Sequence, residues 1–146
     1  MTDFNLNSFK SLYQTFDSEM LERLSEFYSP NIAFKDPIHQ LQGLGALKDY
    51  FAGLCNPEQQ CSFVFTNQVV TNQQAFLQWQ MHYRHPRLNK GKRLTLDGGS
   101  LIKFDTSIFY HEDFYDMGAM IYQHIPILGW AVKSINAKLV NAHEQD

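Results

Sequence analysis

Three polar residues alternate along one segment in the last third of the chain: His111, Asp113 and Tyr115. In an extended strand, side chains two residues apart project from the same face and lie about 7 Å apart at the backbone. A histidine and an aspartate placed in this way can pair directly or through a water molecule. Such a pair can transfer protons, with the carboxylate fixing the imidazole tautomer, or it can be a satisfied polar pair in a core.

A second candidate carboxylate, Asp36, stands directly before Pro37 at the end of a short apolar segment, 32–34. An aspartate in this position commonly accepts backbone N–H hydrogen bonds and fixes a turn. His39 follows three residues later and can either face the same site as Asp36 or lie in a solvated loop. The sequence therefore leaves Asp36 as either a turn residue or a functional carboxylate.

The elements that must position these residues begin with helices. Large apolar residues recur at three- and four-residue intervals over 4–16, which is typical of an amphipathic helix. Asp17 can cap a second helix, whose apolar period continues over 20–28 until Pro30. A short strand is predicted over 32–34, and a third helix over 43–54.

After Pro57 the pattern changes to alternation. Strands are predicted over 61–71, 75–84, 93–104 and 108–116, with turns between them. Because the helices come first and the strands follow as a meander, we expect an α+β domain.

Two motifs in this framework carry a resemblance to a known family. The first runs over 28–37 (YSPNIAFKDP) and continues over 43–51 (GLGALKDYF), and the second runs over 99–104 (GSLIKF) and 108–116 (IFYHEDFYD). Together with the order of elements, they resemble the nuclear transport factor 2-like superfamily, including its SnoaL-like, ketosteroid isomerase-like and limonene epoxide hydrolase-like members. The resemblance covers roughly residues 9–116. It implies a cone in which a strongly curved, mixed or antiparallel sheet wraps around the N-terminal helices and leaves a largely apolar cavity.

The resemblance to ketosteroid isomerase-like members implies catalytic roles. The position of Asp36 is there the general base that moves a proton beside a ketone. Tyr13 lies near the tyrosine that donates a hydrogen bond to the enolate oxygen, and Ser100 takes the place of a protonated acid with the same task. A serine hydroxyl is the weaker acid, so the oxyanion hole is incomplete. His111 and Asp113 are a candidate acid–base pair.

The resemblance to epoxide hydrolase-like members implies a different mechanism, which the residues do not support. Asp113 matches one of the two carboxylates that activate water there, but Trp79 and Met81 stand where the arginine and the second aspartate should be. With Asp113 on the inner face, alternation predicts a mostly apolar lining. The expected ligand-binding residues are Trp79, Met81, Tyr83, Ser100 and Tyr115, with His39 in the neighbouring loop.

Composition limits the classes of function. The chain has 146 residues, of which 44% are hydrophobic and 18% charged, so one globular domain spanning 1–146 is expected. With 12 basic and 15 acidic side chains it lacks the basic field of a nucleic-acid-binding protein. No apolar run is long enough to span a bilayer and no signal peptide is recognisable, so we expect a cytoplasmic protein without a membrane partner.

No metal or other cofactor is expected, because the histidines show no paired ligand spacing on one element. Cys55 and Cys61 are interpreted as buried thiols of a reducing compartment, with a redox or zinc role as the alternative. The segment 82–87 and the neighbouring hairpin 89–93 are locally basic. They form either a solvated strand end or a lip that binds anions.

The last segment, 118–142, is more apolar than a surface helix requires, and a helix covering the cone mouth or a homodimer contact is expected there. The sequence thus predicts a cone domain that binds a hydrophobic small molecule, and two functions remain open. One is an isomerase or other proton-transfer enzyme acting on a carbonyl compound. The other is a non-catalytic ligand-binding or dimerisation module, and a homodimer is expected in both cases.

Overall fold

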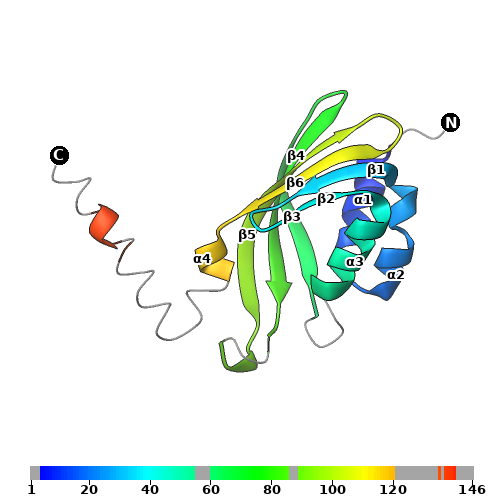
Figure 1. Ribbon diagram of the computed structural model, residues 1–146. Helices are drawn as coiled ribbons and strands as arrows, with labels where there is room; N and C mark the ends of the chain where they lie inside the picture. Colours follow the sequence, from blue (N-terminus) through cyan, green and yellow to red (C-terminus); the bar gives the residue numbers. More distant parts are fainter. Residues whose placement is uncertain (1–3, 55–59, 86–88, 121–134, 136, 141–146) are drawn as a thin grey trace.

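The computed structural model describes residues 4–54, 60–85, 89–120, 135 and 137–140. One mixed sheet of six strands has the order β2-β1-β6-β5-β4-β3, and three helices cover one of its faces (Figure 1). The helices are α1 (Leu6–Tyr13), α2 (Ser18–Glu22), α3 (Leu44–Leu54) and the short α4 (Met117–Met120), with 3₁₀ turns at Leu24–Glu26 and Asn89–Gly91. The strands are β1 (Tyr28–Lys35), β2 (Gln40–Gln42), β3 (Ser62–Val70), β4 (Gln74–Tyr83), β5 (Leu94–Phe104) and β6 (Ile108–Tyr115). The predicted α+β class is confirmed.

The N-terminal helices begin at side-chain caps. Asn5 accepts a hydrogen bond from the backbone N–H of Ser8 at 3.1 Å, and Asp17 accepts one from Met20 at 3.0 Å. These carboxylate and amide oxygens satisfy N–H groups that a first helical turn leaves without partners. The predicted cap at Asp17 is therefore confirmed.

The second helix is shorter than its apolar period predicts. It ends at Glu22, a 3₁₀ turn follows, and β1 already begins at Tyr28 instead of residue 32. The carbonyl of Phe27 accepts a hydrogen bond from the backbone N–H of Ile108 at 2.8 Å, which recruits this segment into the sheet. The helical spacing was misleading because Phe27 and Tyr28 are both buried in the same core, as a strand end rather than as a helix face.

Strand pairing across the sheet assembles the site. β1 runs parallel to β6, with Phe34 beside His111, so that the chain after β1 passes close to Asp113. β5 is antiparallel to β6, with Ser100 opposite Asp113. β4 continues the antiparallel order, with Trp79 opposite Gly98. Four chain segments that are distant in sequence thus meet on one face of the sheet.

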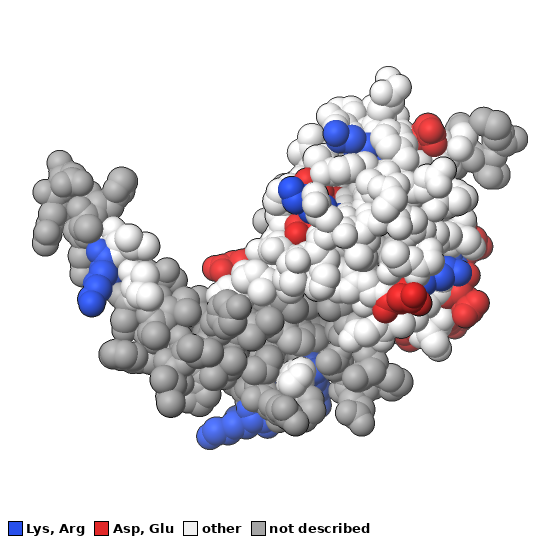
Figure 2. Space-filling model, in the orientation of Figure 1, with Lys and Arg blue, Asp and Glu red and all other residues white. Residues whose placement is uncertain are grey.

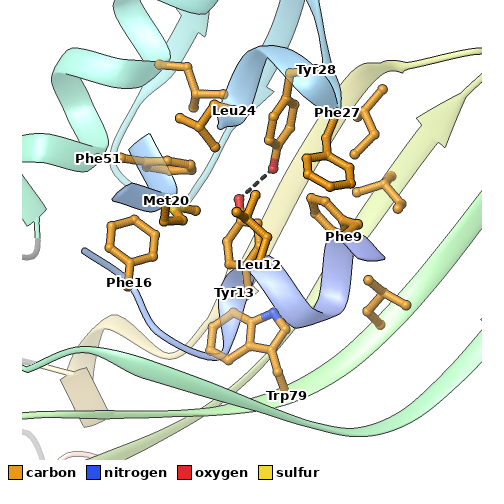
Figure 3. Close-up of a cluster of buried hydrophobic side chains, with 14 of the residues drawn as sticks. Phe9, Leu12, Tyr13, Phe16, Met20, Leu24, Phe27, Tyr28, Phe51 and Trp79 are labelled. Carbon is orange, nitrogen blue, oxygen red and sulfur yellow. Dashed lines mark hydrogen bonds between the residues drawn. The ribbon is translucent and has the colours of Figure 1, made fainter. Parts of the chain in front are cut away.

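The core lies between that face and the helices (Figure 3). Aromatic rings from α1 dominate it, and Phe9 and Tyr13 have ring centroids 4.9 Å apart. Burial of each large apolar side chain stabilises the fold by about 1.5–3 kcal/mol. Labelled members in Figure 3 are Phe9, Leu12, Tyr13, Phe16, Met20, Leu24, Phe27, Tyr28, Phe51 and Trp79.

Two further predictions concern the C-terminal segment and Cys61. Residues 137–140 are helical, but 121–134, where a lid or dimer contact is predicted, lie outside the described residues. Cys61 is buried and disulfide-bonded, so the interpretation as a free thiol is wrong at that position.

Candidate active site

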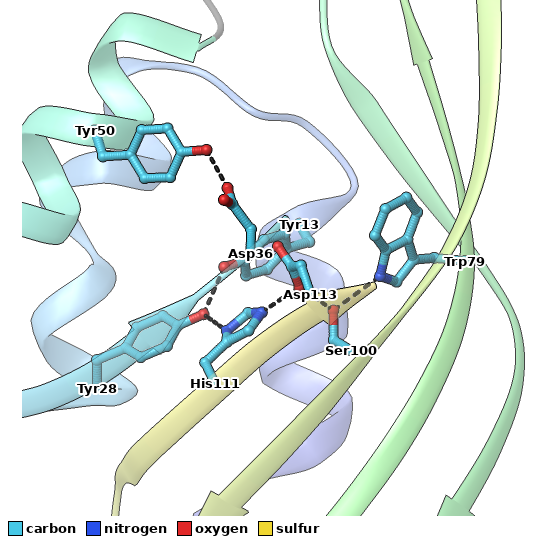
Figure 4. Close-up of polar contacts among 8 residues, drawn as sticks. All are labelled: Tyr13, Tyr28, Asp36, Tyr50, Trp79, Ser100, His111 and Asp113. Carbon is cyan, nitrogen blue, oxygen red and sulfur yellow. Dashed lines mark hydrogen bonds and ion pairs between the residues drawn. The ribbon is translucent and has the colours of Figure 1, made fainter. Parts of the chain in front are cut away.

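A continuous chain of hydrogen bonds lies on the inner face of the sheet, the face that packs against the helices (Figure 4). The hydroxyl oxygens of Tyr13 and Tyr28 lie 2.5 Å apart. Tyr28 Oη is 2.7 Å from Nδ1 of His111, whose Nε2 is 2.6 Å from Oδ1 of Asp113. Tyr13 comes from α1, Tyr28 from β1, and the other two from β6, so the chain joins three elements.

A second branch reaches the same carboxylate from the neighbouring strands. Trp79 Nε1 donates to Oγ of Ser100 at 2.8 Å, and Ser100 donates to Oδ1 of Asp113 at 2.5 Å. An indole N–H can only donate, so the serine hydroxyl uses its own proton for the carboxylate. The expected inward orientation of Trp79 and Ser100 therefore serves to hold Asp113.

The direction of the first branch follows from the same rules. A carboxylate oxygen accepts, so Nε2 of His111 donates in this bond. In the tautomer that carries its proton on Nε2, Nδ1 accepts from Tyr28. Tyr28 in turn accepts from Tyr13. Every donor in both branches is thus directed toward Oδ1 of Asp113, an arrangement in which successive hydrogen bonds strengthen one another.

The other oxygen of this carboxylate is available. Within the part of the chain that the structure describes, Oδ2 of Asp113 accepts no hydrogen bond, and the side chain is 19% exposed. One oxygen is therefore fixed by two donors while the second can meet a ligand. That division suits a general base, which needs a fixed orientation and a free lone pair.

The apolar surroundings of the first branch keep its phenols protonated. Burial raises the pKa of Tyr13 and of Tyr28 well above the ordinary tyrosine value, and the negative charge of Asp113 raises both further. Both groups therefore remain neutral hydrogen-bond donors throughout the physiological pH range.

A stability change at alkaline pH follows from these two phenols. Above pH 10 an unfolded chain releases their protons while the folded chain retains them, so the free energy of unfolding falls as the pH rises. Each retained proton contributes a slope of about 1.4 kcal/mol per pH unit. Urea unfolding at pH 9, 10 and 11 should show this loss, with a shallower slope in Tyr28→Phe. An identical slope in that variant would contradict the burial of this phenol.

Asp36 has no such available oxygen. Its Oδ1 accepts the backbone N–H groups of Ile38 at 2.8 Å and His39 at 2.7 Å, and its Oδ2 accepts the hydroxyl of Tyr50 from α3. The Asp36 side chain is 3% exposed. The His39 ring is about half exposed and packs on Tyr50, with ring centroids 4.6 Å apart. These contacts are those of a turn residue, one of the two roles predicted for Asp36.

The two aspartates nevertheless act on the same pair of phenols. Burial raises the pKa of Tyr50 and of Tyr115, and the charges of both Asp36 and Asp113 add to the rise in each. Tyr50 and Tyr115 therefore lie within electrostatic reach of both carboxylates. Asp36 and Asp113 have different hydrogen-bond partners, but both carboxylates lie near the same two phenols.

A narrow cavity adjoins the Asp113 network. Its volume is about 10 Å³, which is room for roughly one water molecule. Its lining consists of Phe9, Tyr13, Phe63, Phe65, Leu77, Trp79, Ser100, His111 and Asp113. Of the predicted ligand-binding residues, Trp79 and Ser100 line it, whereas Met81, Tyr83, Tyr115 and His39 do not. A larger ligand needs these walls to move apart.

Two tyrosines of the site were not predicted from the sequence. The helical period predicts a helix at Tyr28, whereas alternation with Ile32 and Phe34 along one strand places it on the inner face. Tyr50 lies next to Phe51 on α3, and nothing in the helical period distinguishes it from a core residue. Only the positions of their hydroxyl groups in three dimensions reveal their partners.

The described residues offer neither a metal site nor a membrane-spanning helix. Among the described residues, no cluster of three or more histidine, cysteine, aspartate or glutamate side chains could hold a metal ion. No helix in the described ranges is long and apolar enough to cross a bilayer.

The fold agrees with the comparison to known families. The model of the SnoaL-like domain matches residues 9–111, which is most of the chain. The chain belongs to this SnoaL-like family. No curated protein matches it significantly in sequence.

Three solved structures illustrate the similarity of this SnoaL-like chain in fold. One is proposed to be a SnoaL-like polyketide cyclase from Jannaschia sp. CCS1, with a TM-score of 0.66 and 15% identity over 79% of this chain and 88% of that one. Another is a nuclear transport factor 2-like protein of unknown function from Exiguobacterium sp. 255-15, with a TM-score of 0.62 and 18% identity over 77% and 98%. A third, proposed to be an isomerase of the SnoaL-like family from Agrobacterium tumefaciens, has a TM-score of 0.59 and 14% identity over 75% and 92%.

A glycine next to the network permits the position of Trp79. A Cβ atom at Gly98 would lie 2.3 Å from the Trp79 ring, which is buried. We expect Gly98→Ala to lower the free energy of unfolding by about 1–3 kcal/mol, as overpacked cores do. The matched control is Gly99→Ala, where the Cβ would meet the ring of Phe76 at 2.4 Å. Because Phe76 is 41% exposed and can turn into solvent, urea unfolding should show a smaller loss there. Equal losses would contradict the confinement of Trp79.

Proposed function

We propose that this SnoaL-like chain binds a hydrophobic carbonyl compound and transfers a proton on it, with Asp113 as the general base. The observation that carries the proposal is that the two oxygens of the Asp113 carboxylate have different surroundings. Its Oδ1 is held by His111 and Ser100, and its Oδ2 accepts no hydrogen bond from the described residues. Trp79 and phenylalanine rings provide the apolar wall against which a hydrophobic ligand would pack.

In this mechanism Oδ2 of Asp113 removes a proton from the carbon next to the carbonyl group. The electron pair moves to the carbonyl oxygen and forms an enolate, and the protonated carboxyl group then returns the proton to the same or another carbon. His111 and Ser100 act as positioning residues, because their hydrogen bonds fix the angle of the carboxylate. Ser100 and Tyr13, predicted as oxyanion donors, both donate within the network, so they would have to exchange partners to meet the enolate oxygen.

The names of two structural neighbours are compatible with this chemistry. One is proposed to be a polyketide cyclase and another an isomerase. Cyclisation through a carbon–carbon bond and isomerisation beside a ketone both begin with removal of a proton next to a carbonyl group. The proposal commits to this common step and leaves the product open.

Hydrogen–deuterium exchange measures the common step directly. A panel of hydrophobic ketones and β,γ-unsaturated ketones is incubated with the protein in D₂O, and loss of the α-proton signal is followed by proton NMR. Exchange of at least one compound faster than in buffer is expected. No acceleration across the panel would count against the proton-transfer proposal and would favour the alternative.

The alternative is a non-catalytic ligand-binding or dimerisation module, and the outer face of the sheet favours its second form. The exposed rings of Phe76 and Phe114 lie there with centroids 6.4 Å apart, and Val69 is paired with Phe76 on the adjacent strand. We propose that this apolar face forms a homodimer. Light scattering of the full chain should give the mass of two chains, and a monomer at micromolar concentration would contradict this assembly.

A cytoplasmic location is also part of the proposal, and one feature counts against it. Disulfides such as that of Cys61 are rare in the reducing cytosol. Alkylation under denaturing conditions in freshly lysed cells distinguishes the two possibilities, because Cys61 is buried in the folded chain. A modified Cys61 supports the cytoplasm, and a Cys61 that is modified only after reduction supports an oxidising compartment.

A further inference from the structure

A basic pocket lies at the end of the sheet formed by β3, β4 and β5, apart from the Asp113 network. Its volume is about 300 Å³, and its lining consists of Gln60, Ser62, His82, Tyr83, Arg84 and Arg93. None of these lining residues is acidic. In Figure 2, lysine and arginine side chains are visible at the lower end of the molecule, on the side where Figure 1 places the ends of β4 and β5.

Strand pairing brings the two arginines together. Tyr83, the last residue of β4, is paired with Leu94, the first residue of β5, and Arg84 and Arg93 adjoin this pair just outside the two strands. Like charges brought close together at the end of an antiparallel strand pair repel each other. Among the described residues neither arginine forms an ion pair, so no protein carboxylate there compensates this repulsion. An anion between the two guanidinium groups would do so.

The other groups of the pocket are suited to the same task. Ser62 is paired with His82 across β3 and β4, so its hydroxyl lies on the arginine side of the sheet and can donate. His82 contacts Thr95 at 2.9 Å. Burial and the positive charge of Arg93 lower the pKa of His82, which places the charge of Arg93 within reach of this ring.

We propose that this pocket binds a phosphate group, either as the inorganic ion or as the phosphate of a small organic ester. Guanidinium groups bind phosphate oxygens through two parallel N–H donors, and two such forks with a hydroxyl match a tetrahedral dianion. The chain as a whole has a formal net charge of −3, so general attraction of anions is not expected. Binding would therefore depend on these local groups. The site is independent of the proposed proton transfer, because no residue of the pocket belongs to the Asp113 network.

The test is a titration of the full chain with inorganic phosphate at constant ionic strength, followed by backbone amide NMR shifts. Saturable shifts are expected at Ser62 and Thr95. The double variant Arg84→Gln/Arg93→Gln should bind at least about tenfold more weakly. The matched control is Arg23→Gln, since Arg23 lies on the helical side and pairs with Glu26 at 2.7 Å. It should bind phosphate like the wild type.

Two further measurements distinguish an organic phosphate ester from the inorganic ion and test the contribution of the guanidinium geometry. Tighter binding of phenyl phosphate than of inorganic phosphate identifies an organic ester as the ligand class, and equal binding identifies the phosphate group alone. Arg84→Lys/Arg93→Lys keeps both charges but loses the forks, so an intermediate affinity is expected. Linear, non-saturating shifts, or equal affinities of the double glutamine variant and Arg23→Gln, would overturn the proposal.

Discussion

Replacing Asp113 by asparagine should lower the rate of α-proton exchange by about 10²–10⁴-fold, the usual contribution of a general base. The amide has nearly the same shape but cannot accept the proton. Asp36→Asn should reduce the rate less than about tenfold, because both oxygens of Asp36 are occupied by Tyr50 and by backbone N–H groups. Exchange rates of both variants on the most reactive ketone of the panel provide the comparison.

The control for this experiment is Asp97→Asn. Asp97 is an exposed carboxylate on β5 and is paired with Gln80, away from the cavity lining. It should exchange the ketone like the wild type. Equal rates for the Asp113 and Asp97 variants would contradict the role of Asp113, and a larger loss in Asp36→Asn would transfer that role to Asp36.

The largest effect on stability is expected for His111→Ala. The His111 ring is 2% exposed, stacks on Tyr28 and joins Tyr28 to Asp113. Its removal leaves a cavity and takes a hydrogen-bond partner from two polar groups, so the free energy of unfolding should fall by about 3–5 kcal/mol. Urea unfolding measures this loss.

A matched histidine and a milder variant test the cause. His39→Ala removes a ring that is 47% exposed and should cost less than about 1 kcal/mol. Tyr28→Phe keeps the ring but removes the hydroxyl between Tyr13 and His111, for an expected cost of about 1–2 kcal/mol. A loss below 1 kcal/mol in His111→Ala would show that the buried network does not stabilise the fold.

Strand alternation carried most of what the sequence predicts about this site. The period of two placed His111 and Asp113 on one face, and the pair is hydrogen-bonded in the structure at 2.6 Å. It also placed Trp79 and Ser100 on the inner face, where they line the cavity. Alternation predicts these faces because side-chain direction in a strand depends on local geometry alone. The same alternation also predicts Met81, Tyr83 and Tyr115 as lining residues, and these three do not line the cavity.

The parts that the sequence did not predict depend on contacts between distant segments. The parallel pairing of β1 with β6 brings Tyr28 to His111, and no local sequence signal predicts that β1 pairs with β6. The helical spacing at Phe27 and Tyr28 predicts the wrong element for the same reason. That Oδ1 of Asp113 accepts two hydrogen bonds while Oδ2 accepts none from the described residues can be seen only when the positions of both Ser100 and His111 are known.

The most direct test of the central claim is a crystal structure of the protein with the ketone that it binds most tightly. Our account predicts that the cavity beside Trp79 widens to hold the ligand, and that the carbon next to its carbonyl group lies about 3–3.5 Å from Oδ2 of Asp113. Oδ1 should keep its hydrogen bonds to His111 and Ser100. A ligand bound elsewhere, or one in the cavity with Oδ2 directed away from it, would contradict the account.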